Sequence, residues 1–230
     1  MNTAHASPDS NTLFLPKKNK TTSLPRVKEL ASATVGYDRL PAAQSTDTWL
    51  TPPELIWGSP KEGYTGLGPF DLDPCTPEEG MPWPTSTGTM LKPSDDGLTT
   101  GWPADAFVFM NPPFGRGQEA WMEKMANHPG GGIALVFART ETRWFQRFVL
   151  NHPNVSAVVF QAVRLKFHRA NGDVGDAPHA GPAWIAYGEE GARRLKRAVK
   201  EGQIRGCFLE LDFARVSWVL GAGAGAANDE

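Results

Sequence analysis

The segment Asn111-Pro112-Pro113-Phe114 carries the residue types best suited to chemistry, and it directly follows an apolar run that ends at Met110. Two successive prolines remove two N–H donors and fix two φ angles, so we expect unpaired acceptors to face outward here. Acceptors from Asn111 and Pro112 can hold both hydrogens of an –NH2 group and aim its lone pair. Phe114 then offers a flat face on which a base can stack. The alternative interpretation is a strand stopped by a proline turn, with Phe114 buried.

A second polar segment, Asp71-Leu72-Asp73-Pro74, ends the apolar run that begins at Gly68. We expect this run to be a buried strand that stops at Pro74, because proline interrupts a strand. A carboxylate at a strand end can pair with an ammonium group or with ribose hydroxyls. Asp71 and Asp73 are therefore candidates for binding a cationic or hydroxylated ligand.

Short apolar runs alternate with helical patterns along the chain, which is typical of an α/β sheet with helices on its faces. We expect strands at 68–72, 106–110, 133–137, 155–160 and 207–213, a strand pair at 164–168 and 183–187 around a Gly-rich loop, and helices at 118–126, 142–150 and 189–200. In such sheets, ligands bind outside the carboxyl ends of the strands. The polar segments at 71–74 and 111–114 lie where such a site is expected.

The composition is typical of a globular protein, with 40% hydrophobic and 21% charged residues in a chain of 230. Residues 1–46 are rich in Ser, Thr, Asn, Pro and Lys without sustained periodicity, which predicts a disordered tail. Residues 221–230 alternate Gly and Ala before turning polar, which predicts a second, flexible tail. The remainder, 47–220, has the size of a single domain.

Several absences narrow the class of protein. The longest nearly apolar run, Gly132 to Ala138, is far shorter than the roughly 20 residues of a membrane helix. The first residues include Asp9 and lack the apolar stretch of a signal peptide. Cys75 and Cys207 have no neighbouring cysteine, and the histidines lack metal-ligand spacing. We therefore expect no metal, no membrane contact and two reduced thiols in a cytoplasmic protein.

Charge is distributed unevenly, although the net charge is only −2. Residues 47–106 contain ten acids and two bases, whereas 139–170 and 191–205 each contain six bases and one acid. Such a chain could hold a cationic small molecule close to a polyanion. The run at 191–205 is equally well interpreted as the solvated face of a helix. Four bases on loops at strand ends are candidates for phosphate contacts, namely Arg139, Arg143, Arg164 and Lys166.

Taken in order, these segments resemble the phage-type DNA N-6-adenine methyltransferases, the Dam-like family found in phages and prophages. The motifs that carry the resemblance are Trp49-Leu50-Thr51-Pro52-Pro53-Glu54, Asp71-Leu72-Asp73-Pro74, Asp95-Asp96-Gly97-Leu98, Trp102, Asn111-Pro112-Pro113-Phe114, Ala138-Arg139-Thr140 with Thr142 and Trp144-Phe145, and Arg164-Leu165-Lys166-Phe167. The resemblance runs from about Asp47 to Gly188. It is specific because it uses several motifs together.

The resemblance implies a compact Rossmann-like sheet with helices on both faces. It further implies S-adenosylmethionine-dependent methylation of the exocyclic amine of adenine in double-stranded DNA, after the base has left the stack. Residues 111–114 would hold that base. The implied cofactor residues are Thr51, Pro52, Asp71, Asp73, Pro74 and Asp96. If the chain is phage-encoded, the reaction would take place in the cytoplasm of a bacterial host.

Residues 75–93 depart from the family pattern, in which a helix rich in small residues follows the Asp-Pro pair. Prolines and glycines in this segment predict a loop or a broken helix. The short interval before Met110 leaves too little chain for several complete strand–helix units. We expect either a trimmed sheet or one small strand at 89–91.

Two other functions fit the same residues. Methylation of RNA or of a protein glutamine is one, because the 111–114 segment can hold any planar –NH2 group. A non-catalytic DNA-binding module that keeps the fold is the other. The Asp-Gly-Leu and Arg-Leu-Lys-Phe segments favour DNA, and an intact 111–114 segment favours an enzyme. The sequence shows no separate recognition domain, so we expect base recognition from loops such as 75–93 and 168–182.

Overall fold

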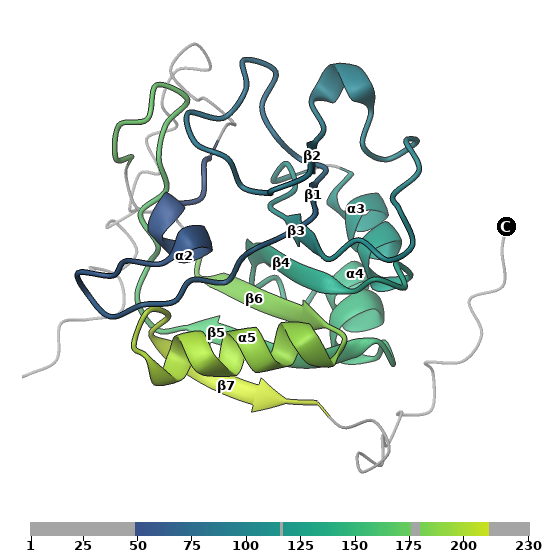
Figure 1. The fold of residues 1–230 in the computed structure, drawn as a ribbon. Helices are drawn as coiled ribbons and strands as arrows, with labels where there is room; N and C mark the ends of the chain where they lie inside the picture. Colours follow the sequence, from purple (N-terminus) through teal and green to yellow (C-terminus); the bar gives the residue numbers. More distant parts are fainter. Residues whose placement is uncertain (1–48, 116, 176–179, 212–230) are drawn as a thin grey trace, which may run out of the picture. The chain divides into compact units, whose positions relative to one another are not determined.

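The computed structural model describes residues 49–115, 117–175 and 180–211, and the account that follows concerns these residues (Figure 1). The tails expected at 1–46 and 221–230 lie outside them. The strands are β1 (Leu72–Asp73), β2 (Thr89–Met90), β3 (Val108–Met110), β4 (Gly132–Phe137), β5 (Val155–Gln161), β6 (Pro182–Tyr187) and β7 (Gly206–Glu210). The helices are α2 (Pro53–Trp57), η1 (Pro93–Asp95), α3 (Gln118–Ala126), α4 (Arg143–Phe145) with its π-helical continuation η2 (Gln146–Leu150), and α5 (Glu189–Lys200).

All seven strands form one mixed sheet, in the order β2-β1-β3-β4-β6-β5-β7. The strands from β2 to β4 pair in parallel, whereas β6 is antiparallel to both β4 and β5. Because β4 and β5 flank the same antiparallel strand, they run in the same direction. The carboxyl ends of β1, β3, β4 and β5 therefore share one edge of the sheet, here called the carboxyl edge.

The order in which strands are added to the sheet reverses between β1 and β3. From β1 it proceeds to β2 on one side, and it then returns to place β3 on the other side of β1. Leu72 of β1 pairs with Val108 of β3, so these neighbours end close together. A crevice outside the carboxyl ends of two such strands is the usual ligand site of an open α/β sheet.

Helices cover both faces of the sheet. Leu55 and Ile56 of α2 and Leu195 and Ala198 of α5 pack against one face. The helices α3 and α4 pack against the other face, with Met122 and Phe145 among their buried side chains. The central strands β4 and β6 consist almost entirely of apolar residues, as expected for strands covered on both faces.

The structure confirms most of the elements expected from the periodicity, but of the strand expected at 68–72 only Leu72 belongs to β1. The helices at 118–126 and 189–200 have the expected bounds, and β2 is the small strand expected near 89–91. The predicted pairing of 164–168 with 183–187 is wrong, because β6 pairs with β4 and β5 instead. The 164–168 segment has alternating buried and exposed residues, but it takes part only in two isolated bridges, which join His168 to Leu50 and to Val174. The prediction for β7 extended to Phe213, which lies outside the described residues.

None of the helices in the described parts of the chain combines the length and the apolar character needed to cross a membrane.

Candidate active site

Asn111 follows β3 directly, and its side-chain amide is held in one orientation. Its Nδ2 atom donates to the main-chain oxygen of Trp49 (2.8 Å) and to Oγ1 of Thr51 (3.2 Å). Because a main-chain oxygen can only accept, the amide nitrogen must lie on that side. The Oδ1 atom is buried and has no hydrogen-bond partner among the described residues. Asn111 thus presents an unused acceptor, which an –NH2 group could satisfy.

The remainder of the 111–114 segment supplies a second acceptor and an aromatic ring. Pro112 is buried, and no donor among the described residues reaches its carbonyl oxygen. Phe114 is half-buried and stacks on Phe137 with a centroid distance of 4.1 Å and an interplanar angle of 23°. Phe167 contacts its edge at 6.0 Å. One face of Phe114 is therefore occupied by the protein, while part of the ring stays accessible.

Thr51 and Pro52 lie beside Asn111 because α2 begins there. Pro53 occupies the first turn of α2, where its missing N–H leaves no gap in the hydrogen bonding. Thr51 is only 1% exposed, and its main-chain oxygen accepts from Nε1 of Trp83 (3.0 Å). The 75–88 loop thus folds back over the start of α2. Trp83 and Thr85 of this loop contact Thr51 and Asp73, so the loop lies next to both candidate residues.

Asp73 ends β1 and is 3% exposed. Its Oδ1 atom accepts from the Cys75 N–H (2.9 Å), and its Oδ2 atom accepts from the Thr85 hydroxyl. Burial raises the pKa of Asp73 to about 6, although both hydrogen bonds lower it. Burying a carboxylate is unfavourable, so a cationic ligand at this edge would stabilise it. Asp73 and Asn111 end neighbouring strands at the point where the chain reverses across the sheet.

Asp71 lies before β1 rather than at its carboxyl end. It is exposed, and its carboxylate accepts the Phe107 N–H at 2.8 Å. Its main-chain N–H also donates to the Phe107 oxygen (2.8 Å). The structure therefore brings Asp73 to the carboxyl edge and uses Asp71 to join β1 to the start of β3. Pro74, directly after Asp73, is buried.

Asp96 caps an exposed turn after η1. Its φ of 48° is left-handed, a conformation that aspartate tolerates better than most residues. Its carboxylate accepts the N–H of Leu98, and hydrogen bonding to Thr99 is the largest cause that lowers its pKa. Lys124 of α3 holds this turn through the main-chain oxygens of Gly97, Leu98 and Thr100. Asp96 thus stabilises the turn that carries the Asp-Gly-Leu motif.

A cavity of about 450 Å³ opens beside that turn, over α3. Leu98, Trp102, Lys124 and His128 are among the residues that line it. Asp73 and Asn111 are not among them. This cavity therefore does not include the residues at the carboxyl ends of β1 and β3.

The four bases expected to contact phosphate lie at or near the carboxyl edge. Arg139 follows β4, and Arg143 begins the helix after it, while Arg164 and Lys166 follow β5. All four are exposed, and none makes an ion pair or side-chain hydrogen bond with a described residue. An unpaired set of cations at one edge attracts a polyanion.

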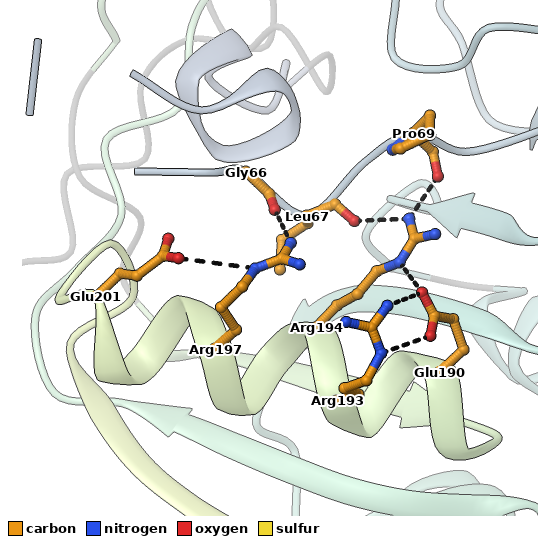
Figure 2. Close-up of polar contacts among 8 residues, drawn as sticks. All are labelled: Gly66, Leu67, Pro69, Glu190, Arg193, Arg194, Arg197 and Glu201. Carbon is orange, nitrogen blue, oxygen red and sulfur yellow. Dashed lines mark hydrogen bonds and ion pairs between the residues drawn. The ribbon is translucent and has the colours of Figure 1, made fainter. Parts of the chain in front are cut away.

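In the second basic run, residues 191–205, two arginines form hydrogen bonds within the protein. Figure 2 shows that two arginines of α5 donate to main-chain oxygens of the segment that leads into β1: Arg194 to Leu67 and Pro69, and Arg197 to Gly66. The Arg194 side chain is only 13% exposed. These two residues position the chain that enters β1 and are not part of a solvated face.

Three further residues contribute polar groups that the sequence did not single out. Trp83 and Thr85 reach Thr51 and Asp73 from a loop of irregular composition. Gln118 begins α3, is 6% exposed, and has an Nε2 atom without a partner among the described residues. A polar residue on the sheet-facing stripe of a helical pattern was the signal that could have identified Gln118.

Comparison with known proteins gives one match. The family model described as DNA N-6-adenine-methyltransferase (Dam) matches residues 40–184, which is more than half of the chain and includes Thr51, Asp73 and Asn111. No curated protein matches the chain, and no solved structure does.

Proposed function

The chain belongs to the DNA N-6-adenine-methyltransferase (Dam) family, and we propose that it uses S-adenosylmethionine to methylate the exocyclic amine of an adenine that has left the DNA stack. The observation that carries this proposal is the Asn111 amide. Its nitrogen is held by Trp49 and Thr51, and its buried oxygen lacks a partner among the described residues. An amine that donates to this oxygen would satisfy it.

Asn111 and Pro112 would act on the amine by hydrogen bonding. Each acceptor takes one hydrogen of the –NH2 group, which leaves the nitrogen lone pair directed away from both. As the amine gains positive charge during methylation, both hydrogen bonds strengthen, so the acceptors stabilise the transition state more than the ground state. The accessible part of the Phe114 ring would stack on the base. Holding the amine in one orientation contributes a large part of the rate gain.

The residues at the carboxyl ends of β1 and β3, where the chain reverses across the sheet, have the chemistry needed to bind S-adenosylmethionine. This cofactor is a cation, and Asp73 is a carboxylate whose pKa is raised by its burial. We assign Asp73 to the positive end of the cofactor, with Thr51, Pro52 and Pro74 lining its site. When bound, S-adenosylmethionine supplies an electrophilic methyl group. Asp71 and Asp96 would support this site through the Phe107 contact and the Asp-Gly-Leu turn.

Duplex DNA would lie across the carboxyl edge. Arg139, Arg143, Arg164 and Lys166 are unpaired among the described residues and would contact phosphates. The affinity for DNA should then fall by about 0.9 log units per contact for each tenfold increase in salt. Alanine at all four positions should flatten this slope, whereas Lys200→Ala, an exposed lysine of α5, should leave it unchanged.

The test of the proposed function is methyl transfer from labelled S-adenosylmethionine to duplex DNA, RNA and bulk protein. We expect label in duplex DNA, recovered as N6-methyladenine after digestion to nucleosides. Asn111→Ala should abolish most of it. Label in RNA or in glutamine side chains, with none in DNA, would overturn the assigned substrate. DNA binding without transfer to any acceptor would instead identify a non-catalytic DNA-binding module.

A further inference from the structure

The loop that follows β5 carries two of the four large hydrophobic side chains that are exposed in the described residues. Val163 is 53% exposed and Val174 is 60% exposed, and the other two, Trp57 and Leu209, lie on different elements. In Figure 1 this green loop extends beyond the sheet on the same side as α2. Exposed valines are unfavourable in water, so each of the two would gain free energy from being covered by a partner.

The tip of this loop is a short, internally bonded hairpin. The N–H of Arg169 donates to the oxygen of Asp173, and the N–H of Gly172 donates to the oxygen of Arg169. Nδ1 of His168 also lies 2.7 Å from the Gly172 oxygen. The hairpin therefore holds its shape without a partner, and little conformational entropy remains to be lost when it binds.

The hairpin is attached to the residues that orient Asn111. Leu50 and His168 exchange two main-chain hydrogen bonds of 2.9 Å, and His168 forms a bridge to Val174 on its other side. Leu50 lies between Trp49 and Thr51, the two partners of the Asn111 nitrogen. With adjacent strands spaced by about 4.8 Å, Val174 is about 10 Å from Leu50.

The surroundings of the two valines are basic. Arg164 and Lys166 lie on the same loop, are exposed, and are unpaired among the described residues. Asp173, an exposed acid, precedes Val174, so the two bases outnumber the acid beside it. An apolar side chain on a loop that also carries bases matches the devices that proteins insert between base steps of a duplex. In such devices the bases contact the phosphates, and the apolar side chain replaces the stacking contacts that the DNA loses.

We propose that Val174 is an apolar wedge that enters the DNA base stack beside the target adenine and fills the space that the adenine leaves. The proposal rests on the proposed function, because a wedge is useful only to an enzyme that must extract a base. Removing a base from the stack costs free energy, and this cost is lowest when the base is already unpaired. Val163 would contact the same groove from the start of the loop.

The experiment compares Val174→Ser with the wild type on two duplexes of one sequence. In the first duplex the target adenine is paired with thymine, and in the second it lies opposite an abasic position. On the paired duplex we expect kcat/KM to fall at least about tenfold, since extraction then lacks its replacement contact. On the abasic duplex we expect a change of less than about twofold, since no pair has to be opened. Val174→Leu should restore activity on the paired duplex.

Two controls distinguish a wedge at Val174 from a general effect of removing exposed apolar surface. Leu209→Ser removes a side chain of similar exposure, 42%, from the edge strand β7, and it should leave both rates unchanged. Fluorescence of 2-aminopurine at the target position should rise on binding of the wild type and much less with Val174→Ser. Equal loss on both duplexes, or no loss on either, would overturn the wedge while leaving the methyltransferase assignment intact. A wild type that methylates neither duplex would overturn both.

Discussion

The side-chain nitrogen of Asn111 lies 2.8 Å from the main-chain oxygen of Trp49, a residue 62 positions earlier in the chain. This contact connects the end of β3 to the segment before α2. It also fixes which atom of the amide is left free, because the nitrogen is used and the oxygen has no partner in the described structure. The orientation of the acceptor is therefore set by a residue that takes no direct part in methyl transfer.

Asn111→Ala should reduce turnover while leaving cofactor binding nearly unchanged. Removing one preorganised hydrogen bond to a group that gains charge typically reduces kcat about 100- to 1,000-fold. Single-turnover methyl transfer measures the loss, and calorimetry with S-adenosylmethionine measures the affinity. Thr51→Val is the matched variant, because it removes one of the two contacts to the Asn111 nitrogen and should cause a smaller loss. Near-normal turnover in Asn111→Ala would exclude this amide as the amine acceptor.

Variants of Phe114 should distinguish a role in stacking on the base, which affects activity, from a role in packing, which affects stability. Its ring already packs on Phe137, so Phe114→Ala should lower the free energy of unfolding by about 1–2 kcal/mol for a half-buried ring. Phe114→Leu keeps most of the apolar volume and loses the flat face, so it should melt closer to the wild type but methylate at least about fivefold more slowly. Phe114→Tyr and Phe114→Trp should retain most activity. If Phe114→Leu is as active as the wild type, the ring is a packing residue alone.

Asp73 should make stability depend on pH in an unusual direction. Its pKa is raised from 3.8 to about 6 by burial, so between these values the folded protein holds a proton that the unfolded chain has released. The free energy of unfolding therefore falls as pH rises from about 4 to about 6, by up to about 3 kcal/mol from this group. Urea unfolding of Asp73→Asn across this range should lack that decline. Glu190, whose pKa is lowered to about 2, affects both proteins equally at lower pH.

A cofactor that brings positive charge to Asp73 should shift its pKa downward. S-adenosylmethionine should accordingly bind more tightly above about pH 6 than below it, because the carboxylate must be ionised. The same comparison with Asp73→Asn should show weak binding at every pH. Cofactor affinity that is equal in the two proteins would contradict the assignment of Asp73.

Two neighbouring arginines of α5 should differ sharply in their effect on stability. Arg194 is 13% exposed, donates to Leu67 and Pro69, and lies 4.4 Å from the centroid of the Phe107 ring, whereas the Arg193 side chain is 62% exposed (Figure 2). We expect Arg194→Met to cost about 2–4 kcal/mol, since it leaves two main-chain oxygens without a donor. Arg193→Met should cost less than about 1 kcal/mol. Equal costs would show that the contacts of Arg194 contribute little.

Local patterns in the sequence were sufficient to predict the helices at 118–126 and 189–200, because the periodicity of their apolar residues lies within the segment itself. The two prolines after an apolar run also predicted that a strand ends just before Asn111, and β3 does end at Met110. The roles of Asp71 and Asp73 could not be separated in this way. They are two positions apart, and a register shift of two residues along β1 decides which one reaches the carboxyl edge.

Long-range partners account for the rest of what the sequence did not reveal. The 164–168 segment alternates like a strand, yet β6 already has β4 and β5 as its two neighbours, which leaves no free edge for it. Trp83 and Thr85 come from a loop without periodicity, so their contacts with Thr51 and Asp73 had no local signal. In the second basic run, the oxygens that engage Arg194 and Arg197 lie more than 120 residues away.

Strand pairing is also much less extensive on one side of the sheet than in its centre. β1 and β2 have two residues each and β1 meets β3 at one register pair, whereas β4 and β6 pair over six positions. Local opening is easiest where few hydrogen bonds and little buried surface must be lost. The amides of β1 and β2 should therefore exchange with solvent faster than those of β4 and β6. A ligand bound at Asp73 would stabilise β1 and β2 against local opening. Part of the binding free energy of the ligand would therefore be used to order these two strands.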